Sequence, residues 1–459
     1  MASALIASRL EALPFRGYVL NLVLIIALGG FFELYDLFLT TYIVPSLIQE
    51  GIYSLKTPGI ADMNAVASFV ASLFLGMFVG AGLLGRLPDK YGRKAVFTWA
   101  LIGYSVCTLI MAFQSEPIWI NFWRFLAAVG IGLEQVTIVT YTSELVASRY
   151  RGRAIALTQV ISFIAMPVVA AISWLLIPTS YLGLAGWRWV VILGASGAVV
   201  VWFMRRAVPE SPIWLAEKGR VEEASAVMER IERRVTAGGF LLAPQSADIL
   251  SNHQSIKIPS THSRWAALFA PGVRERVMLM VLVNVCITVG YYGFGSWVPT
   301  LLLSKGITVT KSLEYSMLMA IAAPLAPALA MLVADKLERK TQVMLSCTCC
   351  AVLGIAFSMQ SMPLVVIILG FLLTLNNGWM SASYHTYQAE MFPAVIRAQA
   401  VGFVYSWSRF SAVFCAFLIS FFLSRYGVLG VFTFITLAMA IIVTVLMLFG
   451  PRTNKLLAS

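Results

Sequence analysis

Long uninterrupted runs of apolar residues follow one another along the chain, separated by short polar segments. Each run is close to the ~20 residues that an α-helix needs to cross the hydrocarbon core of a bilayer. The runs are continuous and do not alternate between apolar and polar residues, so they predict helices and exclude membrane-spanning strands. We expect twelve spanning helices, at residues 18–44, 64–84, 95–113, 117–141, 154–177, 187–206, 277–303, 313–334, 341–360, 363–387, 398–423 and 428–450.

The composition restricts the class of protein further. Hydrophobic residues make up 59% of the 459 positions, charged residues only 12%, and the mean hydropathy is +0.84. Soluble domains carry about 25% charged residues, so a soluble enzyme, a disordered scaffold and a secreted disulfide module are all excluded. The predicted fold class is an all-α membrane protein. The six cysteines fall inside apolar runs, and we expect them to be packed thiols that bind no metal.

The distribution of Lys and Arg predicts the orientation. With both termini in the cytoplasm, 26 of the 33 basic residues lie on cytoplasmic segments, five lie on the opposite side and two lie within helices. This asymmetry follows the positive-inside rule. The net charge of +12 is therefore explained by cytoplasmic loops, and we expect no nucleic-acid partner. The first apolar run is too long for a signal peptide, so no cleavable signal is expected.

A polar stretch separates the sixth and seventh predicted spans. We expect an N-terminal six-helix bundle over residues 1–207, a cytoplasmic linker over 208–275 and a C-terminal six-helix bundle over 276–459. Within the linker, Pro209–Val235 has the charge pattern of one or two amphipathic helices. The part after Gly238 is rich in Ser, His and Pro and reads as a tether. The linker is too short for a nucleotide-binding domain, which excludes an ATP-driven pump.

Two polar motifs recur at one spacing, which indicates an internal repeat. Asp89 and Asp335 are 246 positions apart, and so are Glu144 and Glu390. Two motifs at one offset, each in a set of six predicted spans, indicate a duplicated six-helix bundle in parallel repeat. Such pairs hold a solute near the bilayer midplane and work by rocking.

Charged residues inside predicted spans are costly, so each one requires an explanation. Glu33 and Asp36 are three residues apart and share a helical face. Their mutual repulsion favours proton binding by one of them near neutral pH, as proton coupling requires. The alternative is a buried acid permanently paired with Arg124.

Arg409 stands halfway along the eleventh predicted span, between aromatic residues. Its planar guanidinium suits bidentate recognition of a carboxylate, so we expect Arg409 to bind an organic anion. The alternative is a pair with Glu134 or another acid. Glu134 itself reads equally well as a substrate contact or as a packing partner of backbone amides. Further candidates for a cavity that binds a small flat or polar solute are Tyr291, Tyr292, Trp297, Asn376, Asn377, Trp379 and Trp407.

Several motifs together resemble those of the major facilitator superfamily, in particular its sugar-porter and metabolite–proton symporter branches. They are Asp89…Gly92-Arg93-Lys94, Arg124…Gly130-x-Gly132, Tyr141-x-x-Glu144…Arg151-Gly152-Arg153 and Pro209-Glu210-Ser211-Pro212-x-Trp214-Leu215. The resemblance covers essentially the whole chain and implies the major facilitator fold. Departures are Ala128 and Ile213, where glycine and arginine are usual, and Glu338, where the second-half gate motif usually has glycine. The seventh span lacks the paired glutamines of sugar porters and looks more like the branch of niacin and organic-acid carriers.

The resemblance also implies roles for individual residues. Asp36 matches the proton-coupling acid of sugar-porter symporters, Arg124 its partner, and Gln159 the fifth-helix glutamine aimed at substrate; an interhelical hydrogen bond is an equally good reading of Gln159. The repeated loop residues match a cytoplasmic gate, in which ion pairs between the halves close the inner face and break on switching. Each exposed pair is worth only about 0–1 kcal/mol, which suits a latch. The gating set is Asp89, Arg93, Glu144, Arg151, Asp335, Arg339, Glu390 and Arg397.

These features predict a secondary transporter: proton-coupled symport of a small organic acid, of aromatic or sugar-acid type such as nicotinate, by alternating access. We expect a monomer with no enzymatic activity and no cofactor, crossing the bacterial plasma membrane many times, with protons and a small molecule as its partners. A sugar or polyol symporter is the alternative, followed by an efflux antiporter. A sensor that transports nothing would need an extended tail, but only Pro451–Ser459 follows the last span.

Overall fold

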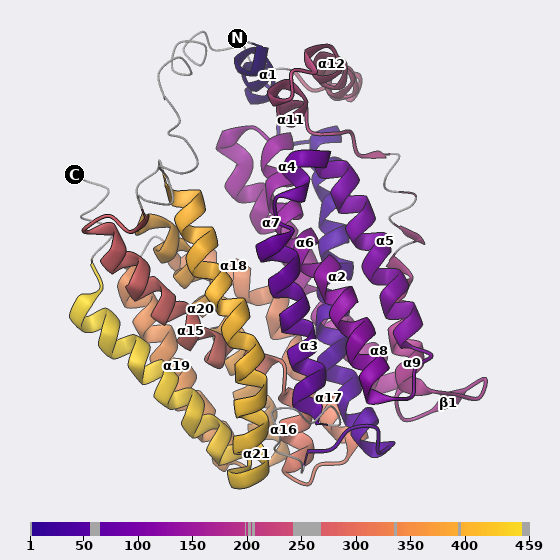
Figure 1. Ribbon diagram of the computed structural model, residues 1–459, viewed down its shortest axis with the longest axis vertical. Coiled ribbons are helices and arrows are strands. Elements are labelled where there is room, and N and C mark those ends of the chain that lie inside the picture. Colours follow the sequence, from indigo (N-terminus) through magenta and orange to yellow (C-terminus); the bar gives the residue numbers. More distant parts are fainter. Residues whose placement is uncertain are drawn as a thin grey trace.

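The computed structural model describes residues 2–55, 65–197, 199, 200, 203, 207–241, 268–334, 337–392 and 396–451. Nearly all of this chain is helical, and the helices run side by side in two groups (Figure 1). The first half comprises α2 (Tyr18–Gln49), α3 (Val66–Phe78) with the π-helix η1 (Val79–Leu83), α5 (Arg93–Met111), α6 (Pro117–Leu145), α7 (Arg151–Phe163) with α8 (Ala165–Leu176), and α9 (Gly186–Ala195). The second half comprises α15 (Val273–Gly295), α16 (Val298–Ser304), α17 (Val309–Ala320) with α18 (Ala322–Ala334), α19 (Arg339–Met359), α20 (Pro363–Glu390) and α21 (Arg397–Phe449).

The helices agree with the predicted spans in number and order. Ten helices in the described part of the chain are long and apolar enough to cross a membrane. One of them, α21, reverses direction at Gly427, where φ is 66°, so it supplies both the eleventh and the twelfth predicted spans. The shorter α9 lies at the start of the sixth. Figure 1 shows the two arms of α21 meeting at the end of the molecule opposite α12.

The seventh span is not the continuous helix predicted over 277–303. Helix α15 ends at Gly295, Trp297 has non-helical backbone angles, and α16 then begins at Val298. Pro299 occupies the first turn of α16, a position where proline has no amide hydrogen to lose and its fixed φ suits the helix. The residue before a proline disfavours the α conformation, so the proline explains why a new helix starts here.

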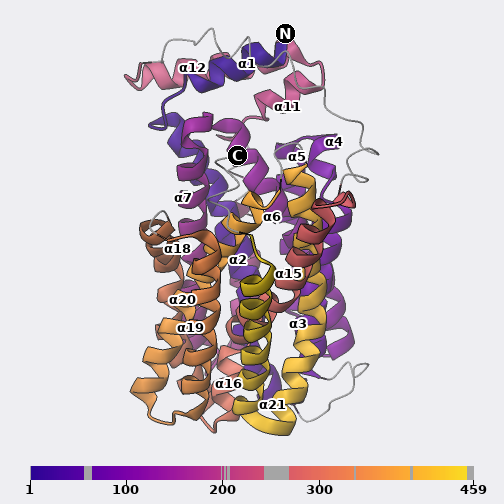
Figure 2. The same cartoon turned by 90° about the vertical axis from the view of Figure 1, so that its left-hand side faces the viewer.

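Three short helices form a layer across one end of the first half. They are α1 (Ala2–Glu11), α11 (Pro212–Glu217) and α12 (Val221–Ala237), and Figure 2 shows them lying over the ends of the long helices. One or two amphipathic helices were predicted within Pro209–Val235, and the structure has two there, α11 and α12; α1 was not predicted. Arg9 of α1 binds Glu232 of α12 through two hydrogen bonds of 2.9 and 2.7 Å. Most of the predicted tether after Gly238 lies outside the described residues.

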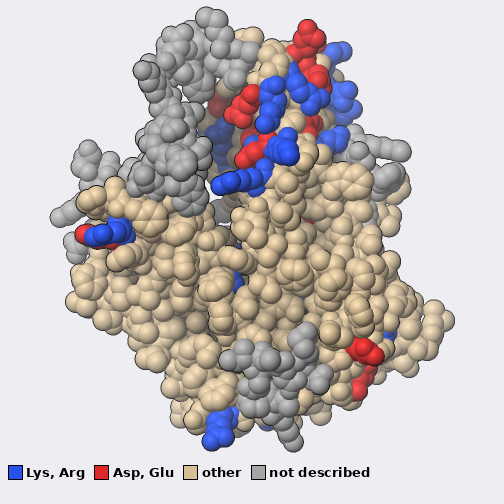
Figure 3. Space-filling view, viewed as in Figure 1, with Lys and Arg blue, Asp and Glu red and all other residues tan. Residues whose placement is uncertain are grey.

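Charged side chains gather at the end that carries this layer, while the broad middle band of the molecule is uncharged (Figure 3). We call this end the gate end, because α4 (Leu87–Tyr91) and the predicted gate residues of the first half lie there. The opposite end carries the short strands β1 (Ser180–Tyr181) and β2 (Leu184–Ala185). An uncharged belt between polar ends is what a bilayer requires of a spanning protein.

Glycines allow the closest helix contacts in the first half. Gly76 and Gly80 lie against the backbone of α6, and Gly132 of α6 lies against the backbone of α3, so that a β-carbon at any of the three would clash. Small residues at such positions let helix backbones approach closely. Between the halves, the rings of Phe74 and Tyr292 meet edge to face with centroids 4.5 Å apart. We call this interface between the halves the seam.

Candidate functional site

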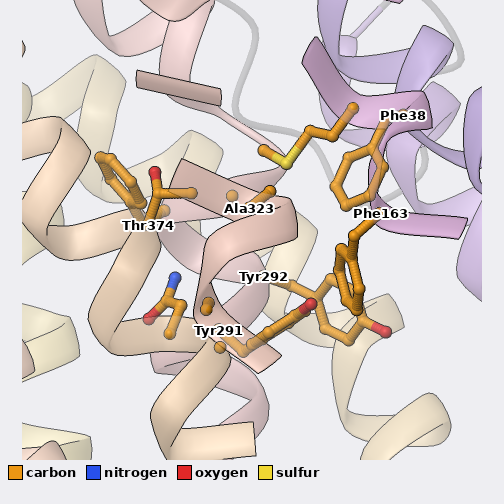
Figure 4. A pocket seen from close by; sticks show the side chains of 12 residues that line it. Phe38, Phe163, Tyr291, Tyr292, Ala323 and Thr374 are labelled. Carbon is orange, nitrogen blue, oxygen red and sulfur yellow. The ribbon is translucent and has the colours of Figure 1, made fainter. Parts of the chain in front are cut away.

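A cavity lies at the seam and contains, with its mouth, about 410 Å³ of empty space. Both halves line it, mostly with aromatic and small side chains, as Figure 4 shows. The first half contributes Phe38, Phe163 and Met166, and the second half contributes Tyr291, Tyr292, Phe294, Gly295, Ala323, Ala326, Thr374, Asn377 and Gly378. The Oδ1 atom of Asn377 is buried and has no hydrogen-bond partner among the described residues. These walls combine aromatic surface with a buried hydrogen-bond acceptor, as sites for small molecules do.

Arg409 lies next to this cavity and joins the two halves. From α21 it donates hydrogen bonds to the hydroxyl of Tyr292, which lines the cavity, and to the hydroxyl of Tyr405 at 2.7 Å. It also donates to Oε1 of Gln135 on α6 at 2.5 Å. The side chain is only 2% exposed, and its Nε finds no partner in the described part of the chain. A buried cation held by neutral groups retains its attraction for an anion.

Asp36 and Arg124 form a fully buried ion pair within the first half. The Nη1 of Arg124 is 3.0 Å from Oδ2 of Asp36, and its Nη2 donates to the backbone oxygen of the same residue at 2.6 Å. The hydroxyl of Thr108 donates to the other carboxylate oxygen at 3.0 Å. Both side chains are 0% exposed. The ion pair expected between Asp36 and Arg124 is therefore present. Whether Asp36 carries the coupled proton stays a prediction.

Glu33 and Asp36 share a helix but face different partners. Glu33 lies beside Gln135 and within the electrostatic reach of Arg409, whereas Asp36 faces Arg124 and Thr108. The Oε1 of Glu33 is buried without a hydrogen-bond partner among the described residues. The two acids therefore have separate surroundings, although their spacing places them on one helical face. Glu33 belongs to the seam, and Asp36 belongs to the interior of the first half.

The gate residues of the first half form a compact network. Arg93, 5% exposed, bonds the Glu144 carboxylate through Nε and Nη2 at 2.8–3.1 Å and lies 2.9 Å from Asp89. Arg151 donates through Nε to the backbone oxygen of Ser143 at 2.9 Å. In the second half, Arg339 pairs with Glu390 at 3.4 Å, and Arg397 donates to the backbone oxygen of Phe392 at 3.2 Å. Asp335 lies outside the described residues.

The gate ion pairs were predicted to join the two halves, whereas Arg93 pairs with Asp89 and Glu144, and Arg339 with Glu390, each within one half. Every ion pair that involves Arg93 or Arg339 in the described part of the chain stays within one half. Arg93 also donates to the backbone oxygen of Pro88, so its guanidinium is fully engaged where it is. The pairs brace each half from inside, and the repeat spacing of 246 residues reproduces the first pair in the second.

Sequence reasoning did not foresee how closely Glu210 and Trp214 attach to the first gate. Glu210 accepts hydrogen bonds from the backbone amides of Arg93 and Lys94, at 2.9 and 3.0 Å, and so caps the start of α5. The indole of Trp214 donates to the backbone oxygen of Asp89 at 2.9 Å. The signal was the motif around Pro209–Leu215 itself, which places an acid and an indole just after the sixth span.

The remaining predicted substrate contacts are dispersed. Asn376 donates to the backbone oxygen of Ser346, and Trp379 donates to Gln342. Trp297 is buried in the break after α15, and Glu134 is fully buried. Gln159 and Trp407 are exposed. None of these lines the cavity, so their role in substrate binding stays a prediction. Tyr291, Tyr292 and Asn377 do line it.

A buried polar network in the second half was missed. The amide of Asn284 donates to Gln388 at 2.7 Å and accepts from the hydroxyl of Tyr384 at 3.0 Å. The ring of Tyr384 lies 4.2 Å from that of His385, which lies 5.2 Å from that of Tyr405. The network therefore reaches the hydroxyl that Arg409 holds. A single Asn in a long apolar run was the available signal.

Two bundles of spanning helices, a small cavity at their seam and buried charges beside it are the features of a multi-pass membrane transporter. The comparisons agree. The model of the family described as sugar (and other) transporter matches residues 22–457, and the chain belongs to this family within the major facilitator superfamily. In fold, the chain is similar to the xylose transporter XylE from E. coli in a partially occluded inward-open conformation, with a TM-score of 0.74, 18% identity and coverage of 95% of this chain and 100% of that one.

Two curated relatives match over nearly the full length. YyaJ of Bacillus subtilis, provisionally named a metabolite transport protein, is 30% identical over 448 residues, which is 98% of this chain and 96% of that protein. The niacin transporter NiaP of Acinetobacter baylyi is 28% identical over 451 residues, 98% of each chain. The fold and the class of protein expected from the sequence are thus confirmed.

Proposed function

We propose that this protein is a proton-coupled symporter that imports a small organic acid across the bacterial inner membrane by alternating access. The observation that carries the proposal is the state of Arg409. Its hydrogen bonds go to two tyrosines and a glutamine at the seam, all neutral groups, beside a cavity with aromatic walls. A carboxylate that displaces Gln135 would gain a charge-assisted bond to the guanidinium.

In this mechanism the acid and the proton use separate sites. The aromatic walls hold the flat body of the solute, Arg409 binds its carboxylate, and Asn377 accepts a hydrogen bond from a donor on it. Protonation of Asp36 from the outside cancels the charge that holds Arg124. Removing one partner of a buried ion pair is costly, about 3–5 kcal/mol, so the protonated state favours a rearrangement of the helices around Asp36. The gate end then faces the cytoplasm, in line with the Lys and Arg distribution.

Both the relatives and the site support a small organic acid as the substrate. One relative is named a niacin transporter, and niacin is an aromatic carboxylic acid of the kind that these walls and Arg409 suit. A sugar is the second candidate. It is favoured by the unpartnered Asn377 Oδ1, which would accept from a hydroxyl, and by a relative named an arabinose-proton symporter, 25% identical over 412 residues.

Uptake by proteoliposomes tests the proposal. Uptake of radiolabelled nicotinate and of D-xylose is measured with and without a pH gradient that is acidic outside the vesicles. We expect gradient-driven accumulation of nicotinate, lost in Arg409→Lys because an ammonium cannot replace the planar fork. Arg425→Lys, on the exposed surface of the same helix, is the matched control and should transport as the wild type does. Accumulation of xylose alone would transfer the proposal to the sugar alternative, and nicotinate uptake unchanged in Arg409→Lys would refute the role of Arg409.

A further inference from the structure

Glu134 is the buried acid of the first half for which the proposed transport cycle has no use. Its side chain is 0% exposed, and neither carboxylate oxygen has a hydrogen-bond partner in the part of the chain described. A carboxylate without partners in a medium of low dielectric constant is strongly disfavoured and takes up a proton instead. Burial without partners therefore favours the neutral carboxylic acid form of Glu134.

The charges around Glu134 support the neutral form. The acids that act on it electrostatically are Glu33 and Asp36 of α2, and from α5 the hydroxyl of Tyr104 is buried without a partner. Neither α3 nor η1, which also pack against α6, carries a titratable side chain. The titratable groups of the other neighbours, α7 and α11, lie at the gate end: Arg151 bonds Ser143, and Glu217 lies near Glu144.

The three buried arginines of the described residues are all engaged elsewhere: Arg93 bonds Glu144 at the gate end. Arg124 is in its ion pair with Asp36, and Arg409 is bonded to Gln135 and two tyrosines, with Glu33 as its nearest acid. No cation of the described residues is therefore left to Glu134. Three acids and two arginines share this interior, and Glu134 is the acid that neither arginine faces.

The three acids form a series that approaches the gate end. Glu134 faces Gly29 of α2, where a β-carbon would stand 3.0 Å from its Oε1. Gly29 precedes Glu33 by one helical turn and Asp36 by two, on the side nearer the gate end. At 1.5 Å per residue, Gly29 lies about 10 Å from Asp36 along the helix. A bulkier residue at Gly29 would fill the space between Glu134 and Phe97, which lies against the same glycine.

We propose that Glu134 is a second proton-carrying group, which receives the coupled proton from Asp36 by way of Glu33 and releases it toward the gate end. The inference rests on the proposed proton-coupled function. One proton moves: it leaves the carboxyl of Asp36, whose carboxylate then pairs with Arg124 again, and it neutralises the carboxylate of Glu134. In the structure Asp36 is paired with Arg124 and Glu134 has no partner among the described residues, which is the arrangement expected after this transfer. Release at the gate end resets Glu134 for the next cycle.

Infrared spectroscopy of the protein in lipid tests the protonation without any substrate. The wild type should show the C=O stretching band of a protonated carboxylic acid at neutral pH. Glu134→Gln should remove that band, Glu134→Asp should keep and shift it, and the exposed Glu222→Gln should leave it unchanged. A band that survives intact in Glu134→Gln would overturn the proposal, whatever the protein transports.

Transport then tests the relay. Radiolabelled nicotinate is used in two assays with the same proteoliposomes, exchange at equal pH and accumulation driven by a pH gradient. Glu134→Gln should lower accumulation several-fold more than exchange, because only accumulation needs a proton released at the gate end. Equal losses in the two assays would overturn the relay. If the wild type accumulates no nicotinate, the proposed substrate fails, and the same comparison is made with D-xylose.

Discussion

Arg93 holds Glu144 in a two-pronged contact, through Nε and Nη2, that the repeat reproduces only loosely 246 residues later. The equivalent pair, Arg339 and Glu390, makes a single contact of 3.4 Å, and both of its side chains are 19% exposed. In the first pair the exposed fractions are 6% for Arg93 and 13% for Glu144. The duplicated motif thus forms a more buried, bidentate ion pair in the first half and a more exposed single contact in the second.

Glu144→Gln should therefore destabilise the protein more than Glu390→Gln. Loss of one partner from a largely buried, bidentate pair costs roughly 3 kcal/mol, whereas a half-open pair is worth about 1 kcal/mol or less. Thermal unfolding of the two variants in the same detergent measures the difference as a shift in Tm. Equal shifts would mean that burial does not distinguish the two gates.

Asp36→Ala should leave Arg124 as an uncompensated buried cation. The expected loss of stability is about 3–5 kcal/mol, and combining the change with Arg124→Gln should restore part of it, because the two residues are directly coupled. Thermal unfolding of the two single variants and the double variant measures the coupling. Asp36→Asn should in addition abolish accumulation of solute under a pH gradient. Uphill uptake by that variant would exclude Asp36 as the proton carrier.

Gln135→Ala should raise the affinity for an anionic substrate. Gln135 occupies the Nη2 of Arg409 at 2.5 Å, and a carboxylate must displace it to bind. A hydrogen bond to a charged group is worth about 1.5–3 kcal/mol, so the gain should be roughly tenfold in Kd. Binding of nicotinate by calorimetry measures it, with Gln114→Ala, remote from the seam, as the control. A weaker affinity would mean that Gln135 binds the substrate together with Arg409.

Gly80→Ala should destabilise the contact between η1 and α6. A β-carbon at Gly80 would clash with the backbone oxygen of Val129, which belongs to a helix and cannot move aside. At Gly103, on α5, a β-carbon would meet nothing within 4 Å, so Gly103→Ala is the matched control. It should stabilise its helix by about 0.5–1 kcal/mol. Opposite shifts in Tm are expected, and a neutral Gly80→Ala would show that the π-helix can adjust.

Much of this architecture follows from the sequence, since lipid leaves few choices. Apolar runs of sufficient length must be helices, and a charge in such a run must find a partner, so the spans and the contact between Asp36 and Arg124 were predictable. The repeat spacing likewise indicated that the motifs around Asp89 and Glu144 recur in the second half. These predictions depend on helical geometry and on the cost of burying charge, which operate locally.

Other features depend on which helices contact each other, and the hydrophobic periodicity of a helix does not predict its neighbours. The bond from Arg409 to Gln135 crosses 274 positions of the chain. The short segment before Tyr18 gave no sign of α1, because its buried apolar residues lie against α11 and α12, which come about 200 positions later in the chain. The break at Trp297 was visible only as a proline two residues later. The gate pairs were assigned across the halves, although Arg93 and Glu144 satisfy each other within one.

The turn at Gly427 has a practical consequence. Since α21 reverses there without a loop, its two arms form one hairpin, and the arm that carries Arg409 has a rigid extension at the surface. Tyr426, beside the turn, is 61% exposed. A spin label at that position would report the travel of Arg409 between states from outside the membrane, leaving every residue around the solute untouched.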